Sequence, residues 1–94
     1  MAKRRIVKIH LEGGTKHEHI AKMIWYDPST PDDRYESTRA QMVSFVTNNP
    51  RQAYVYDAGT STRVLVGVVK ADPPYVRTYR DGEWQDNLLH LPEY

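Results

Sequence analysis

Apolar and polar side chains alternate near the start of the chain, where residues 7–12 read VKIHLE. This period of two predicts a half-buried β-strand with Val7, Ile9 and Leu11 on its apolar face. The glycine pair at 13–14 supplies the positive φ that a hairpin turn needs. The next segment, HEHIAKMIWY, is therefore predicted to return as a second strand.

The register of this hairpin, within residues 5–26, stays open because the sequence does not fix the length of the turn. A two-residue loop places His10 opposite His17, whereas a three-residue loop places Ile9 opposite His19. A shift of one residue turns every side chain to the other face of the sheet.

A helical pattern follows at residues 38–47. Thr38 and Gln41 fit a capping box, in which each side chain bonds the backbone N–H of the other residue. Apolar residues then recur at the spacing of one helix face, and these are Met42, Phe45 and Val46, with Val43 beside them. About ten residues are too few for a stable isolated helix, so we expect it to pack on the sheet and to bury Phe45 there.

Three more strands are expected in the second half of the chain, QAYVYD, TRVLVGVVK and YVRTYR, and EWQ can begin a short return arm. The nearly unbroken apolar run at 64–69 predicts a strand covered on both faces. Gly67 within it indicates a bulge or close packing. Asp81-Gly82 is a strong hairpin signal.

The order β-β-α-β-β-β predicts an α+β fold, a single small domain over residues 1–94 with a mostly antiparallel sheet and one helix on one face. Residues 27–37, DPSTPDDRYES, join the first hairpin to the helix. Their prolines, aspartates and serines predict an exposed acidic loop.

The end of the chain, residues 84–94, is rich in large apolar side chains. We expect an ordered clasp in which four of them close the edge of the core: Trp84, Leu88, Leu89 and Leu91. Pro92 would stop further strand pairing, and Asp86-Asn87 can turn or cap the chain through local side-chain bonds.

Composition narrows the class of protein. The 94 residues are 39% hydrophobic and 27% charged, as in an ordinary globular domain. There are no cysteines, which favours a reducing compartment, and no apolar run approaches the roughly 20 residues of a membrane span. The basic start lacks the apolar segment of a signal peptide. We therefore expect a cytoplasmic protein without a membrane partner.

The closing segment, residues 75–92, carries a motif that resembles a known family. Y-x-R-T-x-x-D-G-x-x-x-D-N-L-L-x-L-P is typical of small bacterial proteins catalogued as domain of unknown function 3892, and it begins here at Tyr75 and ends at Pro92. Trp25 matches an early tryptophan of that family. The resemblance implies a small compact domain and leaves its function open.

Histidines give a weak indication of a metal site. His17 and His19 would share one strand face, and His10 could lie across from them. Imidazoles suit zinc, nickel or copper, and a catalytic zinc site needs three such ligands. Histidines on the solvent face of a strand need no metal, however, so we predict no metal and no cofactor.

Catalytic motifs are missing from the sequence. No serine lies in a Gly-x-Ser-x-Gly setting, and no glycine-rich segment carries the Gly-Lys-Ser/Thr of a phosphate-binding loop. No carboxylate lies in an apolar context that would raise its pKa. The sequence predicts a protein that is not an enzyme.

Tyrosines and arginines alternate on the predicted strands and form the best candidate binding surface. The candidates are Tyr54, Tyr56, Arg63, Tyr75, Arg77 and Tyr79. Aromatic rings flanked by arginine on a sheet hold single-stranded nucleic acid, but such pairs also stabilise sheets. Arg77 could instead pair with Asp81 or Asp86 as a structural brace.

These patterns predict a non-enzymatic binding domain. Its first expected role is a contact with a protein partner or a second copy of the chain, through pairing at a sheet edge. The alternative is single-stranded nucleic-acid binding through the tyrosine and arginine face. The formal net charge of +1 supplies no global attraction to nucleic acid.

Overall fold

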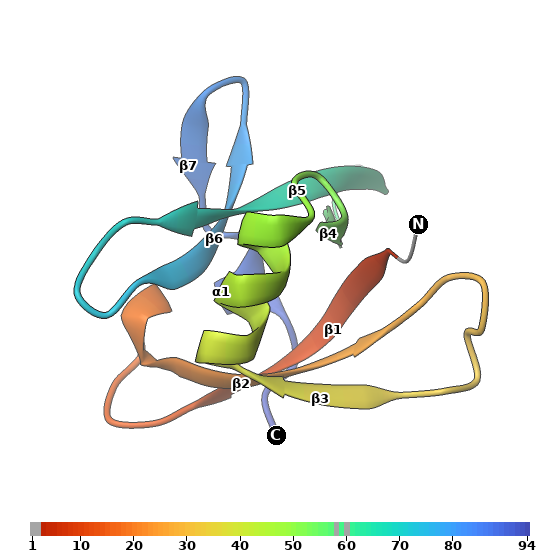
Figure 1. The fold of residues 1–94 in the computed structure, drawn as a ribbon, viewed down its shortest axis with the longest axis horizontal. Coiled ribbons are helices and arrows are strands. Elements are labelled where there is room, and N and C mark those ends of the chain that lie inside the picture. The colour runs from red at the N-terminus through yellow and green to blue at the C-terminus, as the bar shows by residue number, and fades with distance from the viewer. Residues whose placement is uncertain (1–2, 58, 60) are drawn as a thin grey trace.

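The computed structural model describes residues 3–57, 59 and 61–94. It confirms the predicted α+β class: seven strands form one sheet in the order β3-β2-β1-β4-β5-β6-β7, with one α-helix (Figure 1). The elements are β1 (Arg4–Leu11), η1 (His17–His19), β2 (Ile20–Tyr26), β3 (Tyr35–Thr38), α1 (Arg39–Asn48), β4 (Ala53–Asp57), β5 (Thr62–Val69), β6 (Tyr75–Arg80), β7 (Glu83–Gln85) and η2 (Asn87–His90).

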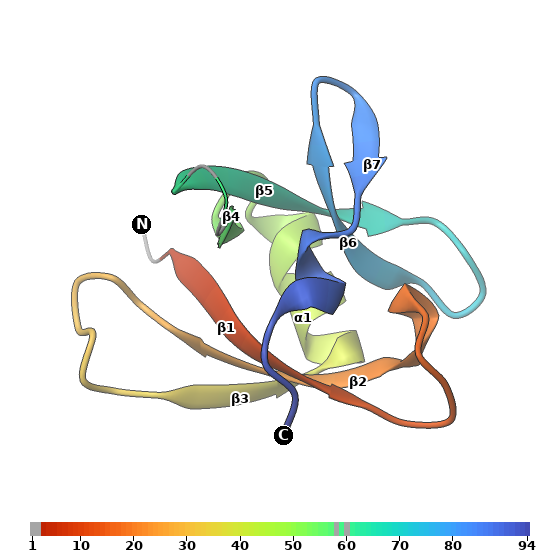
Figure 2. The same cartoon turned by 180° about the vertical axis from the view of Figure 1, so that it is seen from behind.

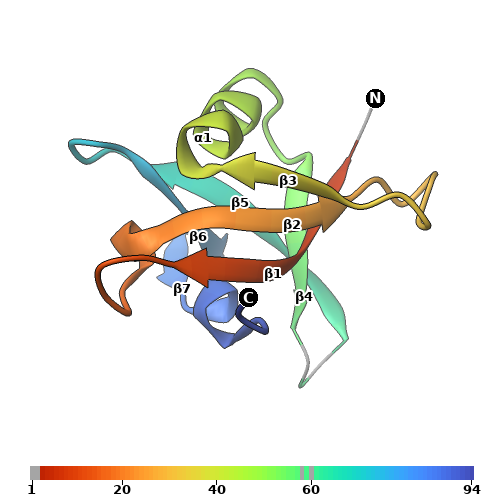
Figure 3. The ribbon, with the colours of Figure 1, turned by 90° about the horizontal axis from the view of Figure 1, so that it is seen from below.

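The sheet bends sharply between β1 and β4, its one parallel pair of strands among the described residues. Only Arg4 with Ala53 and Arg5 with Tyr54 are paired there. Beyond these residues the half-sheet β1–β2–β3 diverges from the half-sheet β4–β7, and the two cross (Figure 3). Helix α1 covers one side of this arrangement and η2 covers the other (Figures 1 and 2).

The core fills the space between the two half-sheets. Its buried members come from both halves, from α1 and from η2: Ile6, Ile9, Ile20, Met23, Met42, Val46, Ala53, Val55, Val64, Val66, Val76 and Leu88. Helix and tail segments therefore close a core that the curled sheet alone would leave open.

Helix α1 begins with the predicted capping box. The backbone N–H of Gln41 donates to Thr38 Oγ1 at 3.2 Å, and that of Thr38 donates to Gln41 Oε1 at 2.9 Å. Met42 and Val46 are buried. Phe45 packs against the core and lies 3.8 Å from the guanidinium of Arg4 on β1, but it is only partly buried, so the expectation that the sheet buries it is met in part.

The first hairpin differs from both predicted registers. Residues 17–19 form the 3-10 helix η1 instead of strand, and Ile9 pairs with Met23 and His10 with Lys22. A bulge at Val7 shifts the alternation, so Ile6 and Ile9 point into the core, whereas Val7 and Leu11 are only partly buried. A bulge adds one residue to one strand and reverses the faces of the residues after it.

The acidic loop is shorter than the expected 27–37. Its last residues belong to β3, an edge strand that pairs with β2. Ser37 is buried there, and its hydroxyl accepts a 2.7 Å bond from Trp25 Nε1. The exposed connection is therefore residues 28–34.

Strand β5 is buried mainly on one face, which corrects the prediction of cover on both. Val64 and Val66 are buried, whereas Leu65, Gly67, Val68 and Val69 remain partly exposed. Gly67 does mark close packing: a Cβ there would lie 3.1 Å from the ring of Tyr79. The turn at Asp81-Gly82 has positive φ at both residues, as the hairpin signal predicts.

The closing segment is an ordered clasp, as expected. Leu88 is fully buried, and the chain then joins the edge of β1 that β4 leaves unpaired. The Ile9 N–H donates to the carbonyl of Pro92, and the Tyr94 N–H donates to the carbonyl of Ile9, both at 3.0 Å. Trp84 was expected in the core, but it lies on β7 and is 44% exposed.

Candidate functional site

The candidate binding residues predicted from the sequence form two groups with different surroundings in the structure. Tyr54, Tyr56 and Arg63 lie on the paired strands β4 and β5. Tyr75, Arg77 and Tyr79 lie on β6, which pairs with the other edge of β5 in the same half-sheet. Only the first group belongs to a continuous surface of stacked rings and guanidinium groups.

That surface, the Arg–Tyr face, consists of Arg5, Tyr26, Arg34, Tyr56 and Arg63. Its groups form a row from β2 across β1 and β4 to β5. The guanidinium of Arg34 lies 4.2 Å from the ring centroid of Tyr26, and that of Arg5 lies 4.3 Å from Tyr56 and 5.7 Å from Tyr26. Each is within the range of a cation–π interaction.

Buried Tyr54 links the row to Arg63. Its ring meets the Tyr56 ring edge-on at 5.7 Å, and the Arg63 guanidinium covers it at 4.3 Å. Burial raises the pKa of Tyr54, and only 2% of the residue is accessible. Tyr54 therefore supports the face from below and presents almost no surface to a ligand.

The outer members of the face are accessible. Tyr56 is 37% exposed, and Arg34 and Arg63 are exposed. Arg5 donates to the Tyr26 hydroxyl at 2.8 Å, which fixes both side chains. A hollow of about 420 Å³ adjoins the row, lined by Arg5, Tyr56, Asp57 and Ser61. Stacked guanidinium groups keep their in-plane N–H donors available for a planar anion.

Arg77 has the structural role that the sequence left open. Its Nη2 is 2.8 Å from Asp86 Oδ1, and its Nε donates to the carbonyl of Gln85 at 3.1 Å. Tyr79 meets Trp84 edge-on at 6.2 Å. The guanidinium of Arg77 is therefore held in a brace by Asp86 and the carbonyl of Gln85.

The three histidines do not converge. His10 lies between the carbonyl of Tyr94 and the Glu12 carboxylate, while the Nδ1 atom of His19 accepts from the backbone N–H of Lys16 at 3.1 Å. His17 is buried beside Asp86. Within the described ranges, no group of three or more histidines or carboxylates could hold a metal ion. The weak alternative of a histidine group on paired strands does not form, because η1 replaces the start of the second strand.

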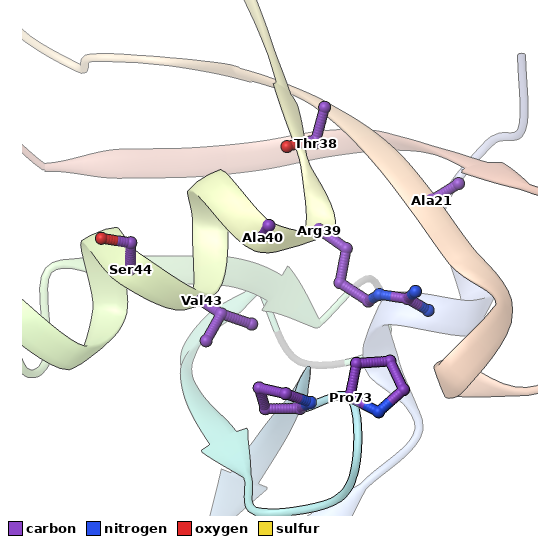
Figure 4. Close-up of a pocket in the computed structure, with 8 residues that line it drawn as sticks. Ala21, Thr38, Arg39, Ala40, Val43, Ser44 and Pro73 are labelled. Carbon is purple, nitrogen blue, oxygen red and sulfur yellow. The ribbon is translucent and has the colours of Figure 1, made fainter.

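A second groove, of about 440 Å³, lies beside the first turn of α1 (Figure 4). Its walls are mostly small or apolar, with Ala21, Val43 and Pro73 among them. Its charged side chain, Arg39, bonds the carbonyl of Glu18. It lacks the converging polar groups that fix a ligand's orientation.

None of the described helices is long and apolar enough to cross a membrane.

Sequence reasoning missed three members of the Arg–Tyr face. Arg5, Tyr26 and Arg34 come from β1, β2 and the loop between β2 and β3. Their alignment with Tyr56 depends on the parallel pairing of β1 with β4, which no local pattern specifies. The basic residues at the start of the chain indicated that arginines lie there. They did not show which arginine points to which face of the sheet.

The fold and this face together define a small α+β domain with a cation–π surface on its curled sheet. A sequence model described as "Protein of unknown function (DUF3892)" matches residues 5–92, so the chain belongs to that family, as its closing motif indicated. No curated protein and no solved structure matches the chain.

Proposed function

We propose that this protein is a non-enzymatic binding domain that holds single-stranded nucleic acid on its Arg–Tyr face. The observation that carries the proposal is the row of three arginines and two tyrosines across four strands of the sheet and the loop between β2 and β3. A bacterial, cytoplasmic setting is part of the proposal, and the absence of cysteine supports its reducing compartment.

The chemistry of the face suits an extended strand of nucleotides. Single-stranded nucleic acids bind where aromatic rings stack with bases and cationic groups contact the backbone. Tyr26 and Tyr56 supply rings, while Arg5, Arg34 and Arg63 supply donors for phosphate oxygens. A duplex hides the faces of its bases, so ring stacking favours single strands.

Chemical-shift mapping tests the location of binding. We expect a single-stranded RNA of about eight nucleotides to shift the backbone amide resonances of Arg5, Tyr26, Tyr56 and Arg63, and to leave those of α1 in place. Shifts confined to α1 or to β7 would contradict the proposal.

Two variants and a matched control test the contacts by fluorescence anisotropy with the same oligonucleotide. Tyr56→Ala should weaken binding by about 1–3 kcal/mol, the usual value of one stacked base. Arg63→Ala should also weaken binding. Lys70→Ala removes the same charge from the exposed loop between β5 and β6 and should leave affinity within about twofold. Equal losses for Arg63→Ala and Lys70→Ala would show that only net charge matters.

A second candidate function is self-association through the β6–β7 hairpin. The hairpin projects from the rest of the molecule (Figures 1 and 2), and β7 is an edge strand. Trp84 is 44% exposed on it, beside a hollow of about 320 Å³ next to Gly67 and Tyr79. Exposed aromatic side chains are enriched at protein interfaces.

Sedimentation velocity over a concentration series tests this second candidate. Self-association through the hairpin predicts a dimer that Trp84→Ala abolishes, with Tyr35→Ala as a control at the opposite edge strand, β3, where Tyr35 is also exposed. A wild-type protein that stays monomeric throughout would rule out the dimer.

A further inference from the structure

A pocket separate from the Arg–Tyr face lies where η1 and η2 meet the edge of β6. Its volume is about 300 Å³, and the lining residues that matter chemically are Lys16, His17, Glu18, Arg77, Asp86 and Leu89. This volume is at the lower end of the range for small-molecule pockets. We call it the η1–η2 pocket.

Opposite charges lie side by side in this pocket. Arg77 Nη2 and Asp86 Oδ1 are 2.8 Å apart, and the bond from Arg77 Nε to the Gln85 carbonyl fixes the guanidinium. The other guanidinium nitrogen of Arg77, Nη1, has no hydrogen bond to the described residues. Exposed Lys16 and Glu18 add a second cation and a second carboxylate from η1 and the residue before it. The pocket lining therefore carries two cationic side chains and two carboxylates.

His17 supplies a buried polar atom without a partner. The residue is 7% exposed, and its Nε2 makes no hydrogen bond within the described part of the chain. Asp86 Oδ1 lies 3.9 Å from this nitrogen, which is too far for a direct bond. Burial and the nearby Arg77 lower the pKa of His17, so the neutral ring predominates at neutral pH. A buried polar group without a partner is destabilising.

We propose that the η1–η2 pocket binds a free α-amino acid with an apolar side chain. The ligand carboxylate is placed on Arg77 and Lys16, and the ligand ammonium on Asp86 and His17. Glu18 adds negative charge near the ammonium, and Leu89 offers apolar surface for the side chain.

The spacing of the charges supports a zwitterion over a simple ion. An α-amino acid carries its carboxylate and its ammonium on groups joined through one carbon, and the pocket presents a guanidinium and a carboxylate in direct contact. An ammonium group has three N–H donors. It can therefore donate to Asp86 and also to His17 Nε2 in the tautomer that leaves this nitrogen unprotonated, which a carboxylate ligand cannot do.

Titration of the ¹⁵N-labelled full chain with L-leucine tests the proposal. We expect the amide resonances of Lys16, His17, Arg77 and Leu89 to shift at or below about 10 mM ligand. Two analogues isolate the two charges: 4-methylpentanoate lacks the ammonium, and 3-methylbutylamine lacks the carboxylate. Each should bind at least roughly tenfold more weakly than L-leucine.

Variants at exposed positions check the contacts without disturbing the brace. Lys16→Met and Glu18→Gln should each weaken L-leucine binding, and Lys70→Met should not. Absence of shifts at about 10 mM L-leucine, or equal affinity for 4-methylpentanoate, would overturn the proposal. Because the pocket shares no residue with the Arg–Tyr face, either result leaves oligonucleotide binding to be judged on its own.

Discussion

Arg4 and Arg5 are neighbours in the sequence, but they act on opposite faces of the sheet. The Arg4 guanidinium lies between the rings of Trp25 and Phe45, at 4.0 and 3.8 Å. Arg5 lies over Tyr56 on the other face. Successive strand residues point to opposite faces, so one arginine stabilises the contact with α1 while its neighbour belongs to the Arg–Tyr face. Burial lowers the pKa of Arg4, but arginine remains protonated in proteins.

At residue scale, Arg77 should contribute more to stability than its partner Asp86. Arg77 makes a bond to the Gln85 carbonyl besides its pair with Asp86, whose side chain is 60% exposed. We expect Arg77→Ala to lower the free energy of unfolding by about 1–3 kcal/mol and Asp86→Ala by less than about 1 kcal/mol. Urea denaturation measures both. Equal losses would show that the backbone bond contributes nothing.

His17 should make stability depend on pH. Burial first, and then Arg77, lower its pKa in the folded protein. The unfolded chain therefore binds a proton more readily, and the free energy of unfolding should fall as pH drops below about 6.5, the ordinary histidine value. His17→Gln should flatten this decline between pH 7 and 5, whereas His90→Gln, at an exposed position, should not. An unchanged decline in His17→Gln would contradict this assignment.

At element scale, the elements with local signals were predictable and those fixed by distant contacts were not. Thr38 and Gln41 mark the start of α1 because they bond each other's backbone N–H groups. Asp81-Gly82 marks the last hairpin because both residues adopt the positive φ of the turn. The composition of Tyr35–Thr38 predicts a loop, but this segment forms β3 because it pairs with the free edge of β2. The bulge at Val7 and the helical turn η1 likewise leave no local pattern.

Helix α1 should depend on Met42 more than on Phe45. Met42 is fully buried in the core, while Phe45 packs one face of its ring on Arg4. We expect Met42→Ala to cost about 2–5 kcal/mol, and Phe45→Ala to cost less because part of its ring is already accessible. Thermal and urea denaturation of both variants measure the difference. The reverse order would show that α1 is rotated from the orientation described.

At the scale of the whole molecule, the closing motif acts as a structural clasp. Arg77 pairs with Asp86, the Thr78 hydroxyl bonds both the side chain and the backbone of Asn87, and Leu88 fills the core. The sequence predicted an ordered clasp from its apolar residues. It could not show that the clasp joins β1, or that β1 pairs with β4, because these partners are far apart in the chain.

Removal of the clasp should unfold the domain. Deletion of residues 86–94 removes the buried Leu88, the bonds to Thr78 and the two backbone bonds to Ile9. One fully buried leucine alone contributes about 1.5–3 kcal/mol, and small domains are stable by only about 5–15 kcal/mol. Circular dichroism should show loss of the cooperative melt. A truncated chain that melts at the wild-type temperature would contradict a structural role for the clasp.

The Arg–Tyr face, on which the proposed function rests, exists only because the parallel β1–β4 contact brings Arg5 beside Tyr56. The sequence indicated Tyr56 and Arg63 as candidate binding residues but did not show that they belong to one face with Arg5, Tyr26 and Arg34. Its three arginines predict a measurable salt dependence, because each phosphate contact releases counterions from the strand.

The most direct test of nucleic-acid binding by this face is the affinity for a single-stranded oligonucleotide across a salt series. With three arginines on phosphates, the logarithm of the association constant should fall against the logarithm of salt concentration with a slope of about −2. Tyr56→Ala should lower affinity at every salt concentration and keep that slope, because stacking releases no counterions. Absence of binding at low salt, or a wild-type affinity that salt does not change, would contradict the proposed function.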